Sequence, residues 1–199
     1  MTSPILKEVP EAFETERLLI RAPRFGDGAA VNAAIQETFE ELRPWMPWAR
    51  QRPTVEESEM YVREAYCNFL QRKELGLLLF LKGTETLVGA SGLHRIRWDI
   101  PRFEIGYWRR SGFQGQGYVT EAVRGLTVYG FEVLGARRVE IRCDARNGPS
   151  RRVAERVGYR LEGTLRSDDL SPDGEPRDTL VFSLLPEEYA SLNLDRIDY

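Results

Sequence analysis

The chain has 199 residues, a formal net charge of −3 and 42% hydrophobic residues. This length and apolar content suffice for one sizeable core, so we expect a single domain over residues 1–199. The charge excludes a domain-wide basic surface of the kind that binds nucleic acid. No apolar run reaches the length of a membrane span, and no basic-then-apolar leader opens the chain. We therefore expect a globular protein of the cytoplasm without a membrane partner.

The two cysteines, Cys67 and Cys143, lie far apart in the sequence. They form no metal-ligand spacing, so no metal site is expected. A single disulfide between them is an open alternative, but two reduced thiols in a reducing compartment are favoured. Cys143 lacks a base that the sequence would reveal, which favours a small core residue over a nucleophile.

The first quarter of the chain indicates a strand followed by an amphipathic helix. Residues 1–13 contain two prolines and are interpreted as a loosely ordered lead-in. Arg17–Ala22 is short, aliphatic and ended by Pro23, which is typical of a strand. Apolar residues then recur at spacings of three and four along Gly28–Leu42, as on one face of a helix, and Pro44 ends that pattern.

A capping motif predicts a second helix. Thr54 is a typical N-cap, and Glu57 three residues later completes a capping box. We expect this helix to extend to about Gln71. Its expected buried residues are Met60, Tyr61, Ala65 and Leu70.

Turn residues divide the next stretch into three strands. Leu75–Leu81 is a continuous apolar run, and a hairpin turn at residues 83–86 connects it to a partner strand, Leu87–Ile96. After a turn at residues 99–101, Arg102–Trp108 alternates polar and apolar side chains as a strand does.

The remainder of the chain alternates helices and strands. The expected elements are the helix Tyr118–Leu134, the strand Arg138–Cys143, the helix Asn147–Val157 and an antiparallel pair, Tyr159–Leu165 with Thr179–Leu184. A meander followed by crossover helices implies an α/β fold with a mixed sheet and helices on both faces.

The glycine-rich turn Ser111–Gly117 connects a strand directly to a helix. Helix N-termini carry unpaired N–H groups and the positive end of the helix dipole, and glycines let these groups approach an anion. Such a turn favours phosphate or pyrophosphate binding. It is not a P-loop, because no Gly-Lys-Ser/Thr follows, and its spacing differs from the dinucleotide fingerprint. A purely structural role for Gly115 and Gly117 is an equally good interpretation of this segment alone.

Residues 114–122, Gln-Gly-Gln-Gly-Tyr-Val-Thr-Glu-Ala, resemble the acetyl-CoA signature of the GNAT superfamily, Gln/Arg-x-x-Gly-x-Gly/Ala. The signature maps onto Gln114, Gly117 and Val119, and Val119 stands where the family usually has glycine or alanine. Four further segments resemble the Rim-type branch of this superfamily, whose best-known members acetylate the N-termini of ribosomal proteins. These segments are Thr15–Arg21, Leu42–Trp48, Glu104–Trp108 and Asn147–Tyr159.

The resemblance implies an N-acetyltransferase that uses acetyl-CoA and acylates an amine directly. It also implies a mostly antiparallel sheet in which the family's fourth and fifth strands splay apart around the pantetheine arm. The pyrophosphate would lie on the backbone N–H groups of Gly115, Gln116, Gly117, Tyr118 and Val119. Asn147 would bind the pantetheine, and a backbone N–H near Gly106–Tyr107 would polarise the acyl carbonyl.

The attacking amine must lose a proton, so a general base is expected. Glu104 is the first candidate, although a glutamate that only neutralises an arginine is an equal alternative. His94 has a suitable ordinary pKa of about 6.5, but a structural histidine is favoured. Ser150 matches a position near the CoA sulfur and either protonates the leaving thiolate or caps the following helix. Tyr107 is a further proton donor candidate.

The acceptor site is expected, by resemblance, to include Trp45, Met46, Trp48 and Glu104. A tryptophan loop that only closes the core is the plainer interpretation of residues 45–48, and the sequence slightly favours it. Possible acceptors are a peptide N-terminus such as that of a ribosomal protein, a polyamine, an aminoglycoside or an aminoacyl compound. A small-molecule or antibiotic acetyltransferase and a non-catalytic acyl-CoA-binding module are the alternatives, and a homodimer is expected from the resemblance only.

Overall fold

The computed structural model describes residues 3–195 and 197–199, and it contains one eight-stranded sheet with the order β1-β2-β3-β4-β5-β6-β8-β7. Its neighbouring strands are antiparallel except β5 and β6, which are parallel, so the expected mixed and mostly antiparallel sheet is confirmed. The strands are β1 (Ala12–Glu14), β2 (Leu18–Arg21), β3 (Leu75–Leu81), β4 (Leu87–Arg97), β5 (Arg102–Arg109), β6 (Arg138–Asp144), β7 (Arg160–Leu170) and β8 (Pro176–Leu184).

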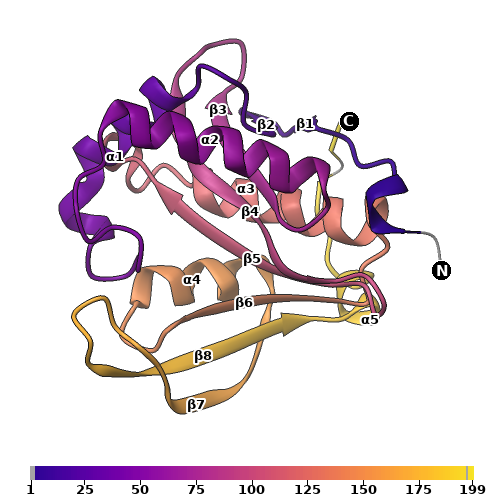
Figure 1. Cartoon of the computed structure of the whole chain (residues 1–199). Coiled ribbons are helices and arrows are strands. Elements are labelled where there is room, and N and C mark those ends of the chain that lie inside the picture. Colours follow the sequence, from indigo (N-terminus) through magenta and orange to yellow (C-terminus); the bar gives the residue numbers. More distant parts are fainter. Residues whose placement is uncertain (1–2, 196) are drawn as a thin grey trace.

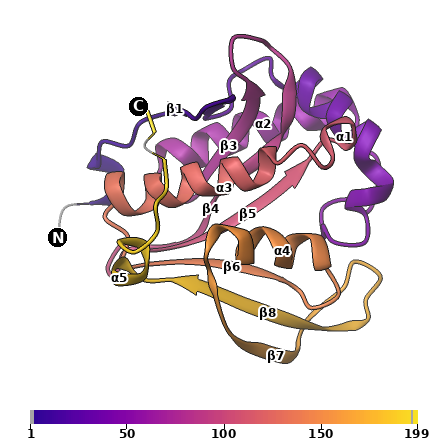
Figure 2. The same cartoon turned by 180° about the vertical axis from the view of Figure 1, so that it is seen from behind.

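Helices cover both faces of this sheet, as predicted (Figures 1 and 2). Helices α1 and α2 lie on one face, and α3 and α4 lie on the other. The α-helices are α1 (Gly28–Leu42), α2 (Val55–Leu70), α3 (Tyr118–Val128), α4 (Gly148–Val157) and α5 (Pro186–Tyr189). A π-helical turn at Tyr129–Val133 continues α3, and 3₁₀ turns form at Pro4–Leu6 and Ser111–Phe113. None of the helices in the described residues has both the length and the apolar composition needed to cross a membrane.

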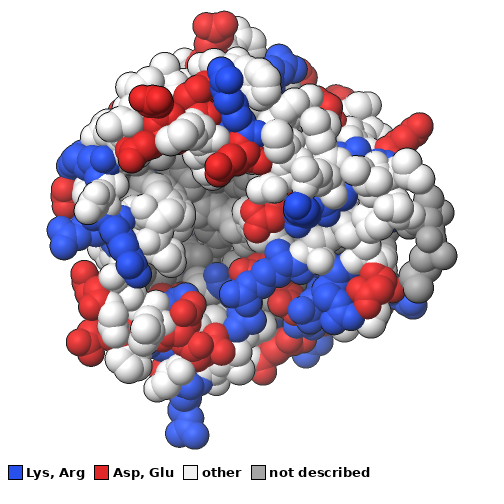
Figure 3. Space-filling view, viewed as in Figure 1, with Lys and Arg blue, Asp and Glu red and all other residues white. Residues whose placement is uncertain are grey.

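The face that carries α1 and α2 is only partly covered by helices. Strands β6, β7 and β8 extend beyond these two helices, and the surface over the middle of the sheet is hollowed (Figure 3). Basic and acidic side chains gather below the hollow, in the region of β6 and β8. This face therefore offers an open and charged surface next to β5.

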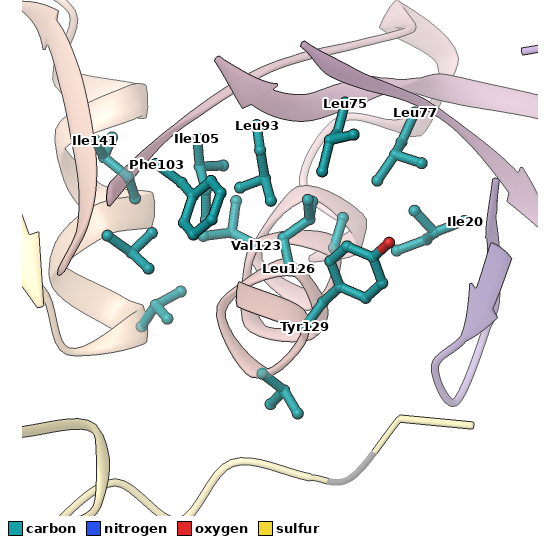
Figure 4. Close-up of a cluster of buried hydrophobic side chains, with 14 of the residues drawn as sticks. Ile20, Leu75, Leu77, Leu93, Phe103, Ile105, Val123, Leu126, Tyr129 and Ile141 are labelled. Carbon is teal, nitrogen blue, oxygen red and sulfur yellow. The ribbon is translucent and has the colours of Figure 1, made fainter. Parts of the chain in front are cut away.

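Side-chain alternation along β3 places the core on both sides of the sheet. Leu77 and Leu79 belong to the cluster that packs against α3, whereas Leu78 and Phe80 pack toward α1 and α2. Figure 4 shows Leu75, Leu77, Leu93, Phe103 and Ile105 arranged around Val123, Leu126 and Tyr129 of α3 and its continuation. A strand buried on both faces needs a continuous apolar run, which is what residues 75–81 provide.

Strands β5 and β6 separate soon after they begin to pair. Their parallel register covers only Arg102↔Arg138, Phe103↔Val139 and Glu104↔Glu140. Beyond that point β5 continues to Arg109 and β6 to Asp144 without pairing to each other, as the diverging ribbons in Figure 2 show. The splay expected from the resemblance is therefore present, and one backbone edge of residues 105–109 faces the opening.

The expected buried face of α2 was wrong. Met60 is 52% exposed and Tyr61 51% exposed, Leu70 is also exposed, and Ala65 is only half-buried. The buried residues are instead Ser58, Val62 and Phe69. The buried face of α2 includes Ser58, whose Oγ accepts a hydrogen bond from Asn32 of α1 over 3.0 Å. Because Ser58 is polar, a search for regularly spaced apolar residues does not identify this face.

Packed structure begins earlier in the chain than the sequence predicts. Val9 and Phe13 are buried, and β1 pairs with β2. Phe13 stacks on Tyr129 with ring centroids 5.0 Å apart, and the Tyr129 hydroxyl donates to the Pro10 carbonyl over 2.6 Å. Residues 9–13 thus pack on the end of α3, which the composition of residues 1–13 does not indicate.

The capping box of α2 provides a test of local stability. Thr54 Oγ1 accepts from the Glu57 N–H over 3.1 Å, and the Glu57 carboxylate accepts from the Thr54 N–H over 2.7 Å. We expect Thr54→Ala to lower the free energy of unfolding by about 1 kcal/mol, measured by urea denaturation, whereas Thr54→Ser keeps the hydroxyl and most of the stability. Equal stability of the two variants would show that the cap contributes nothing measurable.

Candidate active site

The glycine-rich turn has the geometry of an anion-binding helix N-terminus. Gly115 and Gly117 have φ values of +75° and +82°, which side-chain-bearing residues rarely adopt. Gly117 is the N-cap of α3 and gives no side-chain cap, and the Glu121 N–H donates to the Gly117 carbonyl over 3.0 Å. The N–H groups of the first three helical residues, 118–120, precede that bond and have no partner within the helix. A Cβ on Gly115 would project into open space, so the turn is a cradle open to solvent.

Val119, where the family usually has glycine or alanine, does not obstruct this cradle. Its side chain is half-buried and packs against the large core cluster. Its backbone N–H stays in the first turn of α3. The departure from the family signature therefore adds to the core and leaves the polar surface of the turn intact.

Arg17 brings a positive charge to the turn, and the sequence analysis did not identify it as a site residue. Arg17 Nη1 donates to the Gln116 carbonyl over 3.0 Å, and its guanidinium lies 4.4 Å from the centre of the Tyr118 ring. Arg17 Nη2 lies 2.6 Å from the carboxylate of Glu121, the acidic residue of the first helical turn. The ion pair offsets a negative charge that would otherwise repel a phosphate there.

Helix α1 fixes the start of the same turn through two carboxylates. Glu37 accepts from Arg110 Nε over 2.6 Å and from the Gly112 N–H over 2.9 Å. Glu41 accepts from Ser111 Oγ over 2.7 Å and pairs with Arg109 Nη2 at 3.0 Å, and Thr38 Oγ1 accepts from the Ser111 N–H over 2.9 Å. The hydrogen bond from Arg110, followed by that from Gly112, lowers the pKa of Glu37 below its ordinary value. We call Glu37, Thr38 and Glu41 the α1 clamp.

Tyr107 and Ser150 meet across the opening between β5 and β6. The Tyr107 hydroxyl lies 3.1 Å from the Ser150 carbonyl and 3.0 Å from Ser150 Oγ. Burial raises the pKa of Tyr107, so its hydroxyl stays protonated at neutral pH and can donate. Asn147 is the N-cap of α4, because its Oδ1 accepts from the Ser150 N–H over 3.1 Å. Of the two roles considered for the Ser150 hydroxyl, the capping role belongs to Asn147.

Cys143 is buried on the strand next to this pair. Burial raises the pKa of its thiol above the ordinary value, and a hydrogen bond to Ser150 opposes that shift. A thiol of raised pKa is a poor nucleophile at neutral pH. The structure thus supports the interpretation of Cys143 as a core residue.

Glu104 lies at the point where β5 and β6 separate, on the opposite face of the sheet from Tyr107. It is the register partner of His94 on β4 and of Glu140 on β6. Its side chain is mostly buried, and this burial raises its pKa above the ordinary glutamate value, with Arg95 and Arg142 acting in the opposite direction. Arg95 Nε lies 3.5 Å from Glu104 Oε2 without a hydrogen bond, so the pairing with an arginine is loose.

His94 lies over two glycines beside Glu104. A Cβ built on Gly106 would lie 3.2 Å and 3.3 Å from atoms of the His94 ring, and one built on Gly92 would lie 3.3 Å from it. The ring is partly exposed, and His94 Nδ1 lies 3.7 Å from Glu74. A side chain on Gly106 would therefore require the His94 ring to move away.

The tryptophan loop after α1 is only partly packed. Trp48 is 49% exposed, and its ring lies 6.1 Å from that of Trp108 on β5. Met46 packs against the core cluster under α1 and α2, and Trp45 is half-buried. Core packing accounts for Met46, whereas Trp48 presents a ring to solvent close to the far end of β5.

The sheet opens between the parallel strands β5 and β6. An anion cradle and a buried carboxylate lie beside this opening. Such an arrangement suits an enzyme that binds a long phosphate-bearing ligand together with a second substrate. The sequence matches the profile of the acetyltransferase (GNAT) domain over residues 17–160. The chain therefore belongs to the GNAT acetyltransferase family.

Two curated relatives and one solved structure illustrate this similarity. YdaF of Bacillus subtilis, named as a candidate ribosomal N-acetyltransferase, is 39% identical over 104 residues, which are 52% of this chain and 56% of that protein. The match thus spans little more than half of the relative's length. The ribosomal-protein-serine acetyltransferase of Escherichia coli K12 is 27% identical over 133 residues, 66% of this chain and 74% of that protein.

The microcin C7 self-immunity acetyltransferase MccE, solved in complex with acetyl-CoA and AMP, superposes with a TM-score of 0.80. The superposition covers 86% of this chain and 93% of MccE at 23% sequence identity. At that identity the similarity shows a shared fold.

We expect Gly117→Trp to weaken CoA binding at least tenfold, because the side chain would fill the cradle. Gly174→Trp is the matched control, since Gly174 also has a positive φ, of +87°, and lies in the β7–β8 hairpin with open space around it. Titration calorimetry with CoA compares the two folded variants with the parent. If both variants bound CoA with equal affinity, the phosphates of CoA would not bind at this turn.

Proposed function

We propose that the protein is an acetyl-CoA-dependent N-acetyltransferase that transfers the acetyl group directly to an amine. The observation that carries this proposal is the position of Glu104, a buried carboxylate at the point where β5 and β6 part. The cradle at Gly115–Val119 supports the use of a pyrophosphate-bearing donor, and membership of the family agrees with it. Acetyl-CoA supplies the activated acetyl thioester when bound.

The residues around the opening fit that donor. Arg17 and the free N–H groups of the turn match a pyrophosphate in charge and hydrogen bonding. The backbone edge of β5 beyond Glu104 has no partner from β6, so it can hydrogen-bond an extended pantetheine arm in place of a strand. Asn147 uses its side-chain oxygen in the α4 cap, which leaves its amide nitrogen to donate.

Three groups then divide the chemistry. Glu104 takes a proton from the acceptor ammonium, which frees the nitrogen lone pair to attack the acetyl carbonyl. A backbone N–H near Gly106–Tyr107 stabilises the negative charge on the carbonyl oxygen. The Tyr107 hydroxyl, kept protonated by burial and hydrogen-bonded to Ser150, donates a proton to the departing CoA sulfur. The second proton that the attacking nitrogen loses then restores the Tyr107 hydroxyl.

We propose a protein N-terminus, such as that of a ribosomal protein, as the acceptor. The names of the Bacillus subtilis and Escherichia coli relatives support this choice, and such an acceptor would place the enzyme in the cytoplasm. The surface supports it as well, because the hollow on this face is open and charged side chains gather beside it (Figure 3). An extended chain terminus can enter such a surface without displacing a helix.

The deciding experiment has two stages. Calorimetry with acetyl-CoA and CoA tests the donor, and release of free thiol then compares peptides bearing ribosomal-protein N-termini with a panel of polyamines and aminoglycosides. Micromolar acetyl-CoA binding with turnover of the peptides supports the proposal. Turnover of small amines alone would show that the acceptor is a small amine and not a protein N-terminus. A folded protein that binds no acetyl-CoA would contradict the proposed function.

We expect Glu104→Gln to lower kcat at least a hundredfold at neutral pH and to leave CoA affinity unchanged. Because the base acts when deprotonated and burial raises its pKa, kcat of the parent should fall as the pH is lowered through a value above the ordinary glutamate range. Glu104→Gln should lose this acidic limb. Glu74→Gln, which alters an exposed carboxylate beside His94, is the control and should keep it. An unchanged pH profile in Glu104→Gln would exclude Glu104 as the base.

A further inference from the structure

A small polar pocket adjoins Glu104 on the face of the sheet that carries α1 and α2. Its volume is about 70 Å³, room for about two water molecules. Every lining residue is polar or charged, and together they come from the five strands β4 to β8. The lining residues are Arg95, Glu104, Arg142, Asp168, Asp169, Arg177 and Thr179.

Two buried side-chain oxygens without a hydrogen-bond partner belong to residues of this one pocket. Within residues 3–195 and 197–199, Glu104 Oε2 and Thr179 Oγ1 are the buried side-chain polar atoms that lack a partner. Thr179 is only 3% exposed. Leaving such an atom unpaired costs about 1–3 kcal/mol, and buried polar atoms are normally paired with protein groups or ordered water. Both residues line the same water-sized polar space, so a water molecule there is the candidate partner for these atoms.

The backbone around the pocket is strained at two places. Arg95 has a φ of +46° where the β4–β5 register shifts between His94 and Arg97. Ser167 has a φ of +48° where the β7–β8 register shifts between Leu165 and Asp169. Such conformations cost about 1–3 kcal/mol in residues other than glycine. Both irregularities direct residues of their strands to the pocket, Arg95 on one side and Asp168 with Asp169 on the other.

The other carboxylates of the pocket already have partners. Arg142 Nη2 lies 2.8 Å from Asp168 Oδ2, and Arg177 Nη2 lies 2.8 Å from Asp169 Oδ2. Glu104 has only the loose contact with Arg95. Glu104 is therefore the carboxylate of this pocket that receives no hydrogen bond from an arginine.

The proposed reaction requires that a proton leave this region in every turnover. An acceptor ammonium and acetyl-CoA give an amide, CoA with its thiol protonated, and one free proton. The acceptor nitrogen loses two protons in total, and the CoA sulfur takes up one of them. If Glu104 collects the surplus proton, it must pass that proton to solvent before the next cycle, although its Oε2 is shielded from bulk water.

We propose that water held in this pocket by the Thr179 hydroxyl carries the proton from Glu104 to solvent at the β7–β8 hairpin. Thr179 is then a positioning residue that acts on Glu104 through water. This inference rests on the proposed acetyl transfer. It adds the route by which the base is regenerated and the residue that maintains this route.

Several charged groups face Glu104 and set the direction of the expected effect. Arg142 and Glu140 come from β6, Asp168 and Asp169 from β7, Arg177 from β8, and His94 and Arg95 from β4. Burial favours the protonated form of Glu104, and the arginines and a donating water favour the carboxylate. Removing the water should therefore shift the titration of Glu104 to higher pH and slow its regeneration.

The test compares Thr179→Val, which keeps the shape and removes the hydroxyl, with Thr179→Ser, which keeps the hydroxyl. We expect Thr179→Val to lower kcat about tenfold, within the usual range for assisted proton transfer, and to move the acidic limb to higher pH. The KM for acetyl-CoA should stay constant, and Thr179→Ser should behave like the parent within about twofold. Urea denaturation verifies that both variants are folded.

A second measurement does not depend on turnover. Carbon-13 NMR of the Glu104 carboxyl group, assigned by Glu104→Gln, follows its titration in the parent and in both Thr179 variants. A titration shifted to higher pH in Thr179→Val alone supports the water, even if no amine is acetylated and the proposed function fails. Wild-type kcat and an unshifted titration in Thr179→Val, or equal impairment of both variants, would overturn the proposal.

Discussion

The parallel ladder between β5 and β6 ends after Glu104 and Glu140, and the rest of the site depends on this early end. A paired strand satisfies its backbone groups with its neighbour, so a strand that leaves its neighbour needs another partner on that edge. Each strand can leave because it is anchored elsewhere: β5 stays paired with β4 and β6 with β8. The Tyr107–Ser150 contact then spans the opening at one place. The sheet thus keeps its continuity and still exposes a length of unpaired backbone in its interior.

Electrostatic pairing around the opening separates its two faces by function. On the side of α3 and α4, Arg17 offsets Glu121 next to the open N-terminus of α3, which favours a bound anion. On the other side, Asp168 and Asp169 of the polar pocket are hydrogen-bonded to arginines, whereas Glu104 has only a loose contact with Arg95 at 3.5 Å. An unmatched carboxylate close to an acceptor position suits a base, whereas a fully matched one does not. The two faces of the opening therefore differ: one has the open N-terminus of α3 beside a balanced ion pair, and the other has a buried carboxylate that is only loosely paired.

Local patterns predicted the elements but not the contacts between distant segments. The apolar run of β3, the three-and-four spacing in α1 and the Thr54 cap each carry a signal within a few residues, and the structure agrees with them. Ser58 misled the prediction for α2 because a buried serine paired with Asn32 has no apolar signature. Arg17 and the α1 clamp contact residues about 70 to 100 positions away in the sequence. The sequence alone does not distinguish an arginine or glutamate that makes such a contact from one that is only solvated. Glu104 was found through its resemblance to a family strand, whereas its unpaired oxygen depends on the contacts of five strands that are distant in sequence. The homodimer and the single domain stay predictions.

The α1 clamp has a consequence for how such a protein can change. The residues that grip the donor turn occupy the last two turns of α1, and the tryptophan loop begins as soon as that helix ends. The end of this helix therefore sets a fixed spacing between the glycine-rich turn and the tryptophan loop. Substitutions at Trp45 to Trp48 can alter the shape offered to an acceptor without loosening the grip on Arg110 and Ser111. Insertion of one residue between Glu41 and the end of α1 would rotate Glu37 and Glu41 by about 100° relative to the loop. The sequence of the loop can thus vary, while the spacing between the α1 clamp and the loop is constrained.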